Sequence, residues 1–97
     1  MPAGYLIVEI DVADTERYAG YSARTPAVIA KYDGEFMVRA GRTEGLEGAP
    51  PRGRVVVVRF PSYDRALEFY RSDDYADLLA LRLSISESDA FVVEGAD

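Results

Sequence analysis

Four consecutive valines, Val55 to Val58, constrain the fold of this chain more than any other feature. A run of β-branched residues is typical of a buried strand, here from 54 to 60. Pro61 ends the strand, and Ser62 can cap a helix because its hydroxyl accepts hydrogen bonds from the first backbone N–H groups of a helix. The stretch from 54 to 82 therefore predicts a strand that leads into a helical connection.

The helical connection is expected to divide in two, because Ser72 can cap a second segment. The predicted inner faces are Ala66, Leu67, Phe69 and Tyr70, then Tyr75, Leu78, Leu79, Leu81 and Arg82. The stretch from 84 to 88 is expected to unwind this segment. A final strand follows from 90 to 94, with Phe91 and Val93 on one face and Ala90, Val92 and Glu94 on the other.

Two further strands are predicted by alternation of side chains, one from 5 to 11 and one from 35 to about 42. The first places Leu6, Val8 and Ile10 on one wholly apolar face. The second places Phe36, Val38 and Ala40 on its apolar face and Met37, Arg39 and Gly41 on the reverse. A loop rich in glycine and proline then runs from 43 to 53 and should be the most mobile segment.

A helix is expected between these two strands, capped by Asp14 and ended by Asp33 and Gly34. Pro26 has no N–H to donate to the carbonyl of Ser22, and its ring would collide with that carbonyl. We therefore predict a kink or break, with Thr25 as the N-cap of a second segment.

The predicted order is strand, helix, strand, strand, helix, strand, with both helices broken near the middle. Two βα units joined by a hairpin normally give a four-stranded antiparallel sheet with both helices on one face, the ferredoxin-like α+β arrangement. A chain of 97 residues has room for one such core, so residues 1–97 are predicted to form a single domain.

The helices can cover only one face of this sheet, so the other face should be an exposed apolar surface. It would combine Tyr5, Ile7, Met37, Val55, Val57, Ala90 and Val92. Such a patch is larger than most monomers expose, and the same face of a second copy is its simplest cover, so we predict a homodimer. The charges of Glu9, Arg39, Arg59 and Glu94 are also placed there, with Glu9 and Arg59 paired across strands or the charges reaching solvent at the sheet ends.

Composition excludes several function classes. The 17 acidic and 11 basic residues give a net charge of −6, whereas nucleic-acid binding needs a basic surface. The chain lacks cysteine and histidine, so acid–base chemistry would have to use Tyr, Asp, Glu, Lys or Arg. No metal is expected, since the acids at 73, 74 and 77 are explained by helix capping and the helix dipole. No cofactor is expected either, while a haem or flavin supplied from elsewhere stays open. No apolar run near the start suits a signal peptide or a membrane span, which favours a cytoplasmic protein.

Tyrosines are the first group of candidate ligand-binding residues. Helical spacing can point several of them into the space between helices and sheet, where a phenol can donate to a bound carbonyl. Tyr21 and Tyr75 are the preferred candidates, and Tyr18 and Tyr70 are weaker ones. The alternative is that they are core aromatics whose hydroxyls reach the surface.

Charged residues form the second group of candidates. Arg39 and Arg82 could bind a carboxylate or enolate through their guanidinium groups, and Arg24 and Arg42 are weaker candidates. Arg82 could instead satisfy carbonyls at a helix end and lay its stem on the core. Glu44, at the start of the loop, is the nearest residue to a movable carboxylate base, or is simply solvated.

The order and spacing of several short motifs resemble the domain of unknown function 1330 family. The motifs are Asp14, Tyr18 and Tyr21, Lys31-Tyr32-Asp33-Gly34, Phe36, Arg39-Ala40-Gly41, Leu46-Glu47-Gly48, Phe60-Pro61-Ser62, Ala66, Phe69-Tyr70-Arg71-Ser72, Tyr75 and Leu81-Arg82. The resemblance implies a small bacterial protein with a ferredoxin-like fold, assembled as a dimeric α/β barrel, a fold that supports many functions. Asp33 and Ala40 stand where the family usually has glycines, and Ala40 argues against a close approach of backbone or ligand there.

Two hypotheses for function follow. The first is an uncharacterised small-molecule-binding dimer, with a cofactor-independent enzyme acting on a small carbonyl or aromatic compound as its catalytic form, and with Tyr21, Arg39, Tyr75 and Arg82 around the ligand. The alternative is a non-catalytic dimerisation or regulatory binding module. A cavity lined by inward-pointing tyrosines and arginines would favour the first, and a closed, well-packed gap would favour the second.

Overall fold

The computed structural model describes residues 2–96. Its elements are β1 (Gly4–Val12), α1 (Thr15–Lys31), β2 (Glu35–Arg39), β3 (Arg54–Phe60), α2 (Tyr63–Tyr70), α3 (Asp73–Ile85) and β4 (Ser86–Glu94). This order confirms the predicted one, including the division of the second helical connection into α2 and α3. None of the helices in this described part is long and apolar enough to cross a membrane.

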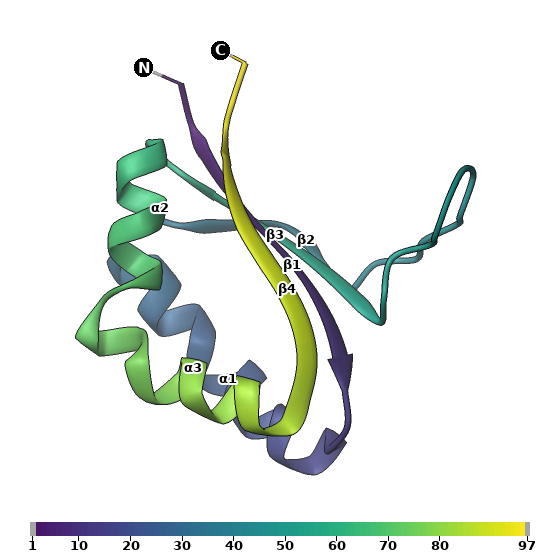
Figure 1. Ribbon diagram of the computed structural model, residues 1–97. Helices are drawn as coiled ribbons and strands as arrows, with labels where there is room; N and C mark the ends of the chain where they lie inside the picture. The colour runs from purple at the N-terminus through teal and green to yellow at the C-terminus, as the bar shows by residue number, and fades with distance from the viewer. Residues whose placement is uncertain (1, 97) are drawn as a thin grey trace.

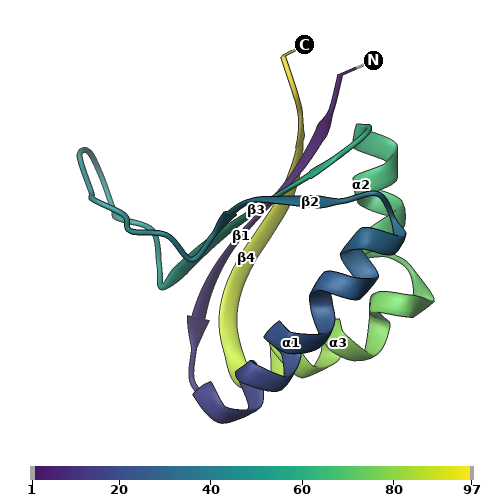
Figure 2. The ribbon, with the colours of Figure 1, turned by 180° about the vertical axis from the view of Figure 1, so that it is seen from behind.

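The four strands form one antiparallel sheet in the order β2-β3-β1-β4. Figure 1 shows the three helices together on one face of the sheet, and Figure 2 shows the same two layers from behind. The predicted ferredoxin-like α+β fold is therefore confirmed. The sheet face that carries no helix is called the outer face below.

The core lies between the sheet and the helices. Phe69 of α2 stacks on Phe60 with ring centroids 5.3 Å apart, and its ring also contacts Tyr75 of α3 at 4.5 Å. The predicted caps position these helices: the Ser62 hydroxyl accepts from the backbone N–H of Arg65, and the Ser72 hydroxyl accepts from that of Tyr75. Local capping thus fixes where each helix begins, and burial of its aromatic residues fixes its position on the sheet.

The prediction that the first helix breaks at Thr25 is wrong, because α1 continues through Pro26 as one helix. The Thr25 side chain does not cap a new segment; its hydroxyl donates to the carbonyl of Tyr21 at 2.6 Å. The carbonyl of Ser22, which Pro26 leaves without its helical donor, accepts from the guanidinium of Arg39 at 2.8 Å. Partners from outside the helix therefore offset the hydrogen bond that proline removes.

The alternation predicted for the second strand is also wrong after its second residue. β2 ends at Arg39, and its register shifts between Phe36 and Val38, so that Val38 lies opposite Val57 and Arg39 lies opposite Val56. An extra residue in one strand reverses which side chains face the core. Val38 is consequently on the outer face, and Arg39 is on the helix side. The segment 40–53 then projects away from the body of the protein (Figures 1 and 2).

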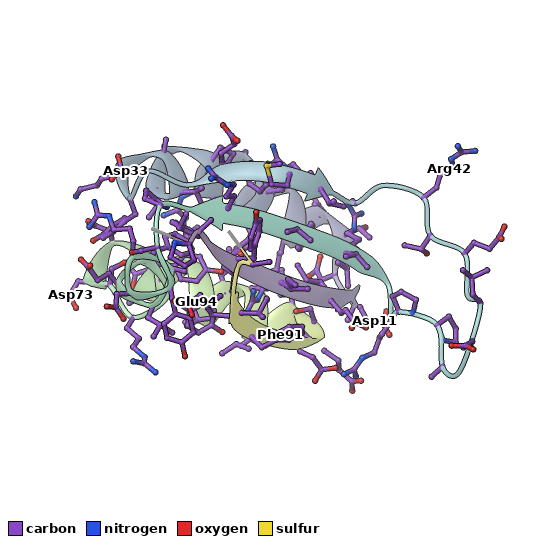
Figure 3. The ribbon with its side chains drawn as sticks, turned by 90° about the horizontal axis from the view of Figure 1, so that it is seen from above. Asp11, Asp33, Arg42, Asp73, Phe91 and Glu94 are labelled. Carbon is purple, nitrogen blue, oxygen red and sulfur yellow. The ribbon has the colours of Figure 1, made fainter. Side chains whose placement is uncertain are left out.

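The last strand is longer than predicted and faces the opposite way. It begins at Ser86, and Val92 lies opposite Leu6 of the core while Phe91 lies opposite Ile7. Ala90 and Val92 therefore lie on the helix side of the sheet, although they were predicted on the outer face. Phe91 and Val93 lie on the outer face instead. Both faces of this strand are apolar, so alternation alone could not decide between them. Figure 3 labels Phe91, which is 53% exposed.

The proposed pairing of Glu9 with Arg59 is not found. Glu9 lies opposite Val55, and Arg59 lies opposite Tyr5 and Glu35. The carboxylate of Glu9 instead accepts a hydrogen bond from the backbone N–H of Arg52 at 3.0 Å. Glu9 therefore holds the end of the long loop against the sheet.

Candidate functional site

A cavity of about 190 Å³ lies between the sheet and helices α1 and α3. Its apolar wall comes from alternate residues of the two central strands: Leu6, Val8, Ile10, Val56 and Val58. Its polar side chains are mainly tyrosines and arginines: Tyr18, Tyr21, Tyr75, Arg39, Arg54 and Arg82. Arg39, Ala40 and Arg54 are the lining residues most exposed to solvent, so the cavity opens where β2 ends and β3 begins.

The hydroxyls of Tyr21 and Tyr75 meet at 2.5 Å and join α1 to α3 beside the cavity. Both tyrosines are buried, with 6% and 1% of their surfaces exposed. Burial and the neighbouring phenol of Tyr21 raise the pKa of Tyr75 far above its ordinary value. Tyr75 therefore remains protonated at physiological pH and can act as a hydrogen-bond donor but not as a base.

Arg82 is the most deeply buried charge in the described chain, with 1% of its surface exposed. Its guanidinium donates to the hydroxyl of Tyr75 at 3.4 Å and to that of Tyr70 at 3.2 Å, while its Nε has no partner among residues 2–96. Burial favours a lower pKa for Arg82, but the surrounding phenols of Tyr75, Tyr21 and Tyr70 shift its pKa upward overall. A buried positive charge thus lies beside the Tyr21–Tyr75 pair.

Two more arginines surround the opening of the cavity. Arg39 lies over the ring of Phe36 at 4.5 Å and bonds to Ser22, so it connects the end of β2 with α1. Arg54 lies over the ring of Tyr18 at 4.9 Å. Sequence reasoning missed Arg54, although its spacing of two from Val56 places it on the helix side of β3 and could have revealed it.

Tyr18 lies within the electrostatic influence of all three arginines. Burial and Tyr21 raise the pKa of Tyr18, and the charges of Arg54, Arg82 and Arg39 oppose this shift without reversing it. The positive charges of the cavity therefore converge near this ring, and its hydroxyl also stays protonated at physiological pH.

The remaining candidates lie elsewhere. Tyr70 contacts Arg82 without lining the cavity, and Arg24 is an exposed residue of α1 that does not line it. Glu44 and Arg42 are exposed in the projecting segment, where Figure 3 labels Arg42. Asp74 accepts hydrogen bonds from Lys31 and Tyr32, and no group of three or more potential metal ligands occurs within residues 2–96. The structure thus brings together Tyr21, Arg39, Tyr75, Arg82 and Tyr18, with Arg54 added.

This arrangement provides hydrogen-bond donors and positive charge but no carboxylate among the lining residues. Such a site can stabilise negative charge on an oxygen atom, for example on a carboxylate or an enolate. It has no side chain that could act as a strong base at neutral pH. A proton leaving a bound compound would have to pass to solvent.

Comparison with known structures supports the fold. The RPA0582 protein of unknown function from Rhodopseudomonas palustris has a TM-score of 0.77 and 15% identity, over 99% of this chain and 84% of that one. A methylated form of RPA0582 has a TM-score of 0.72 and 20% identity, over 99% and 82% of the two chains. SnoaB, a cofactor-independent oxygenase from Streptomyces nogalater, has a TM-score of 0.68 and 14% identity, over 100% and 96%. At these identities the likeness concerns the fold alone.

Sequence comparison is more specific. No curated protein sequence matches the chain. One family model matches residues 3–96, nearly the whole chain. It describes the same family that the order and spacing of the motifs resemble. The chain therefore belongs to the family described as domain of unknown function (DUF1330).

Proposed function

We propose that this protein binds a small carbonyl-containing or aromatic compound in the cavity and acts on it as a cofactor-independent enzyme. The observation that carries this proposal is the contact between the buried cation Arg82 and the Tyr21–Tyr75 hydroxyl pair beside an apolar wall. Pockets of this kind, apolar with a few convergent polar groups, are typical of small-molecule sites.

The chemistry that fits these groups is stabilisation of an enolate. The Tyr21–Tyr75 pair can donate its free hydroxyl proton to a carbonyl oxygen that gains negative charge when a neighbouring carbon loses its proton to solvent, and Arg82 supports that charge. Preorganised donors lower the barrier because they need no rearrangement at the moment of reaction. The likeness of the fold to the cofactor-independent oxygenase SnoaB is compatible with this class of chemistry.

A non-catalytic binding module is the second candidate. It is favoured by the raised pKa of Tyr75 and by the absence of a carboxylate among the cavity residues, because the site then holds a ligand without a base to react with it. In this case the cavity would recognise a compound and leave it unchanged.

Deuterium exchange into acetylacetone separates the two candidates. In D₂O, the protein should accelerate exchange of the central C–H group, as followed by ¹H NMR, and Tyr75→Phe should slow this by about 10²-fold, the usual effect of losing one oxyanion donor. Tyr63→Phe is the matched control, because Tyr63 is 39% exposed on α2 and does not line the cavity. Binding of acetylacetone without faster exchange would favour the binding module, and the absence of both binding and faster exchange would contradict the proposed reaction on a small carbonyl compound.

We also propose that the protein is a homodimer formed through the outer face of the sheet. Support comes from apolar residues on all four strands of this face: Met37, Val38, Phe91 and Val93 are exposed on the two edge strands, and half-buried Tyr5, Ile7, Val55 and Val57 lie on the central strands between them. Monomers rarely expose an apolar patch of this extent, and a sheet face is self-complementary about a two-fold axis.

A further inference from the structure

The charge of the cavity is opposite to the charge of the chain. The whole sequence has 17 acidic and 11 basic residues, yet the lining contains Arg39, Arg54 and Arg82 and neither Asp nor Glu. In a chain with an excess of acidic residues, this segregation gives the cavity a local positive potential. The expected ligand is therefore negatively charged.

The buried arginine lacks the partner that a buried charge normally has. Arg82 is 1% exposed, and the ion pairs found in residues 2–96 involve Lys31, Arg52 and Arg65 but not Arg82. Its contacts are neutral phenols, and its Nε has no acceptor. Buried arginines are usually paired with an anion, and no residue within 2–96 supplies one to Arg82, which favours an anionic ligand as its partner.

The tyrosine pair adds a further free donor. Each phenol has one O–H proton, and the Tyr21–Tyr75 contact uses only one of the two. Whichever hydroxyl donates, the other keeps a proton without an acceptor among the described residues. This phenol proton lies beside the guanidinium of Arg82, which also lines the cavity, so a carboxylate can accept the proton and face the positive charge at the same time.

The size of the cavity limits the rest of the ligand. A cavity of roughly 150 Å³ can enclose a benzene molecule. The present cavity has about 190 Å³, with an apolar wall that includes Val8 and Val56. This leaves room for a single ring or a short aliphatic chain, in addition to one small polar group.

We propose that the cavity binds a small organic carboxylate, with its carboxylate on Arg82 and the Tyr21–Tyr75 pair and its apolar part against the sheet. This inference rests on the proposed small-molecule function and narrows its ligand class. The expected ligand is a monoanion with a small apolar part. Its carboxylate pairs with the charge of Arg82 and accepts the free phenol proton of the Tyr21–Tyr75 pair.

Calorimetric titration with benzoate and benzamide tests this proposal on the wild-type protein. The two probes have the same ring and nearly the same shape but differ in charge. Benzoate should bind at least about tenfold more tightly than benzamide, because charge-assisted hydrogen bonds are markedly stronger than neutral ones. Equal affinity for the two probes would overturn the carboxylate assignment and leave the small-molecule site intact. Failure of benzoate, benzamide and acetylacetone to bind would overturn the proposed function itself.

Substitutions then test the role of Arg82. Arg82→Met removes the charge and keeps the length of the side chain; it should weaken benzoate binding about tenfold or more and leave benzamide binding within about twofold. Arg24→Met is the matched control on α1, outside the cavity, and should change neither affinity. If Arg82→Met does not fold, as judged by thermal unfolding, the comparison of benzoate with benzamide on the wild-type protein still tests the carboxylate assignment. Unchanged benzoate binding in folded Arg82→Met would contradict the proposal.

Discussion

The guanidinium of Arg39, at the end of β2, donates to the carbonyl of Ser22, which Pro26 leaves without its usual donor in α1. This contact lets the helix continue through a proline, and it holds the arginine at the opening of the cavity. We expect Arg39→Met to lower the free energy of unfolding by about 1–2 kcal/mol, the usual contribution of a hydrogen bond from a charged donor at a partly exposed site. Urea denaturation measures this change.

Arg39→Met should lower the free energy of unfolding much less when Pro26 is also replaced. In Pro26→Ala, residue 26 has an N–H that can donate to the Ser22 carbonyl, so Arg39 is no longer needed there. A double-mutant cycle over Arg39→Met and Pro26→Ala should therefore give a positive coupling of about 0.5–1.5 kcal/mol. Strict additivity of the two changes would show that the Arg39–Ser22 contact does not compensate for the proline.

Ala40 adopts a left-handed backbone conformation, with φ of 58°. This conformation is unfavourable for a residue with a Cβ by roughly 1–2 kcal/mol, and glycine avoids most of that cost while losing more entropy on folding. Ala40→Gly should therefore stabilise the protein by up to about 1 kcal/mol in urea denaturation. Ala49→Gly is the control in the same projecting segment, where φ is not positive, and should not stabilise. Destabilisation by Ala40→Gly would contradict the assigned strain.

Asp74 connects α3 to α1. Hydrogen bonds from Lys31 and Tyr32 lower the pKa of the Asp74 carboxyl below its ordinary value. Because the folded pKa is lower than the unfolded one, the stabilisation is fully present above the unfolded pKa and is lost as pH falls through the folded pKa. Wild type should therefore melt above Asp74→Asn at neutral pH, and the two melting temperatures should converge in acid.

Asp77→Asn is the control for this pH dependence, since no hydrogen bond to the Asp77 side chain is found within residues 2–96. Its melting temperature should follow that of wild type across the acid range. If Asp74→Asn and wild type instead differed by a constant amount at every pH, the effect would not come from ionisation of Asp74.

The proposed dimer predicts that a charge on the outer face separates the subunits. Phe91 is 53% exposed on the outer face, so Phe91→Asp should give a monomer in light scattering coupled to size exclusion, because it buries an unpaired carboxylate in the interface. Leu83→Asp is the matched control: Leu83 is 57% exposed on α3, away from this face. A monomeric wild-type protein at micromolar concentration, or a dimer that survives Phe91→Asp, would contradict this interface.

The sequence by itself determined the order of the strands and helices and several of their ends. Ser62 and Ser72 cap helices as predicted because capping involves atoms only a few residues apart. The alternation of Leu6, Val8 and Ile10 likewise predicted their burial, since the reverse positions of that strand are less apolar.

Only the tertiary structure decided which way β4 faces, how β2 shifts its register, and whether α1 survives Pro26. Each of these depends on a partner far away in the chain: Leu6 for Val92, Val57 for Val38, and Arg39 for Ser22. The cavity followed from the same long-range contacts, because the β2 register turns Arg39 toward α1, while Arg54 and Arg82 reach the cavity from β3 and α3. Local periodicity cannot encode such contacts, since their free energy arises only when separate elements pack together.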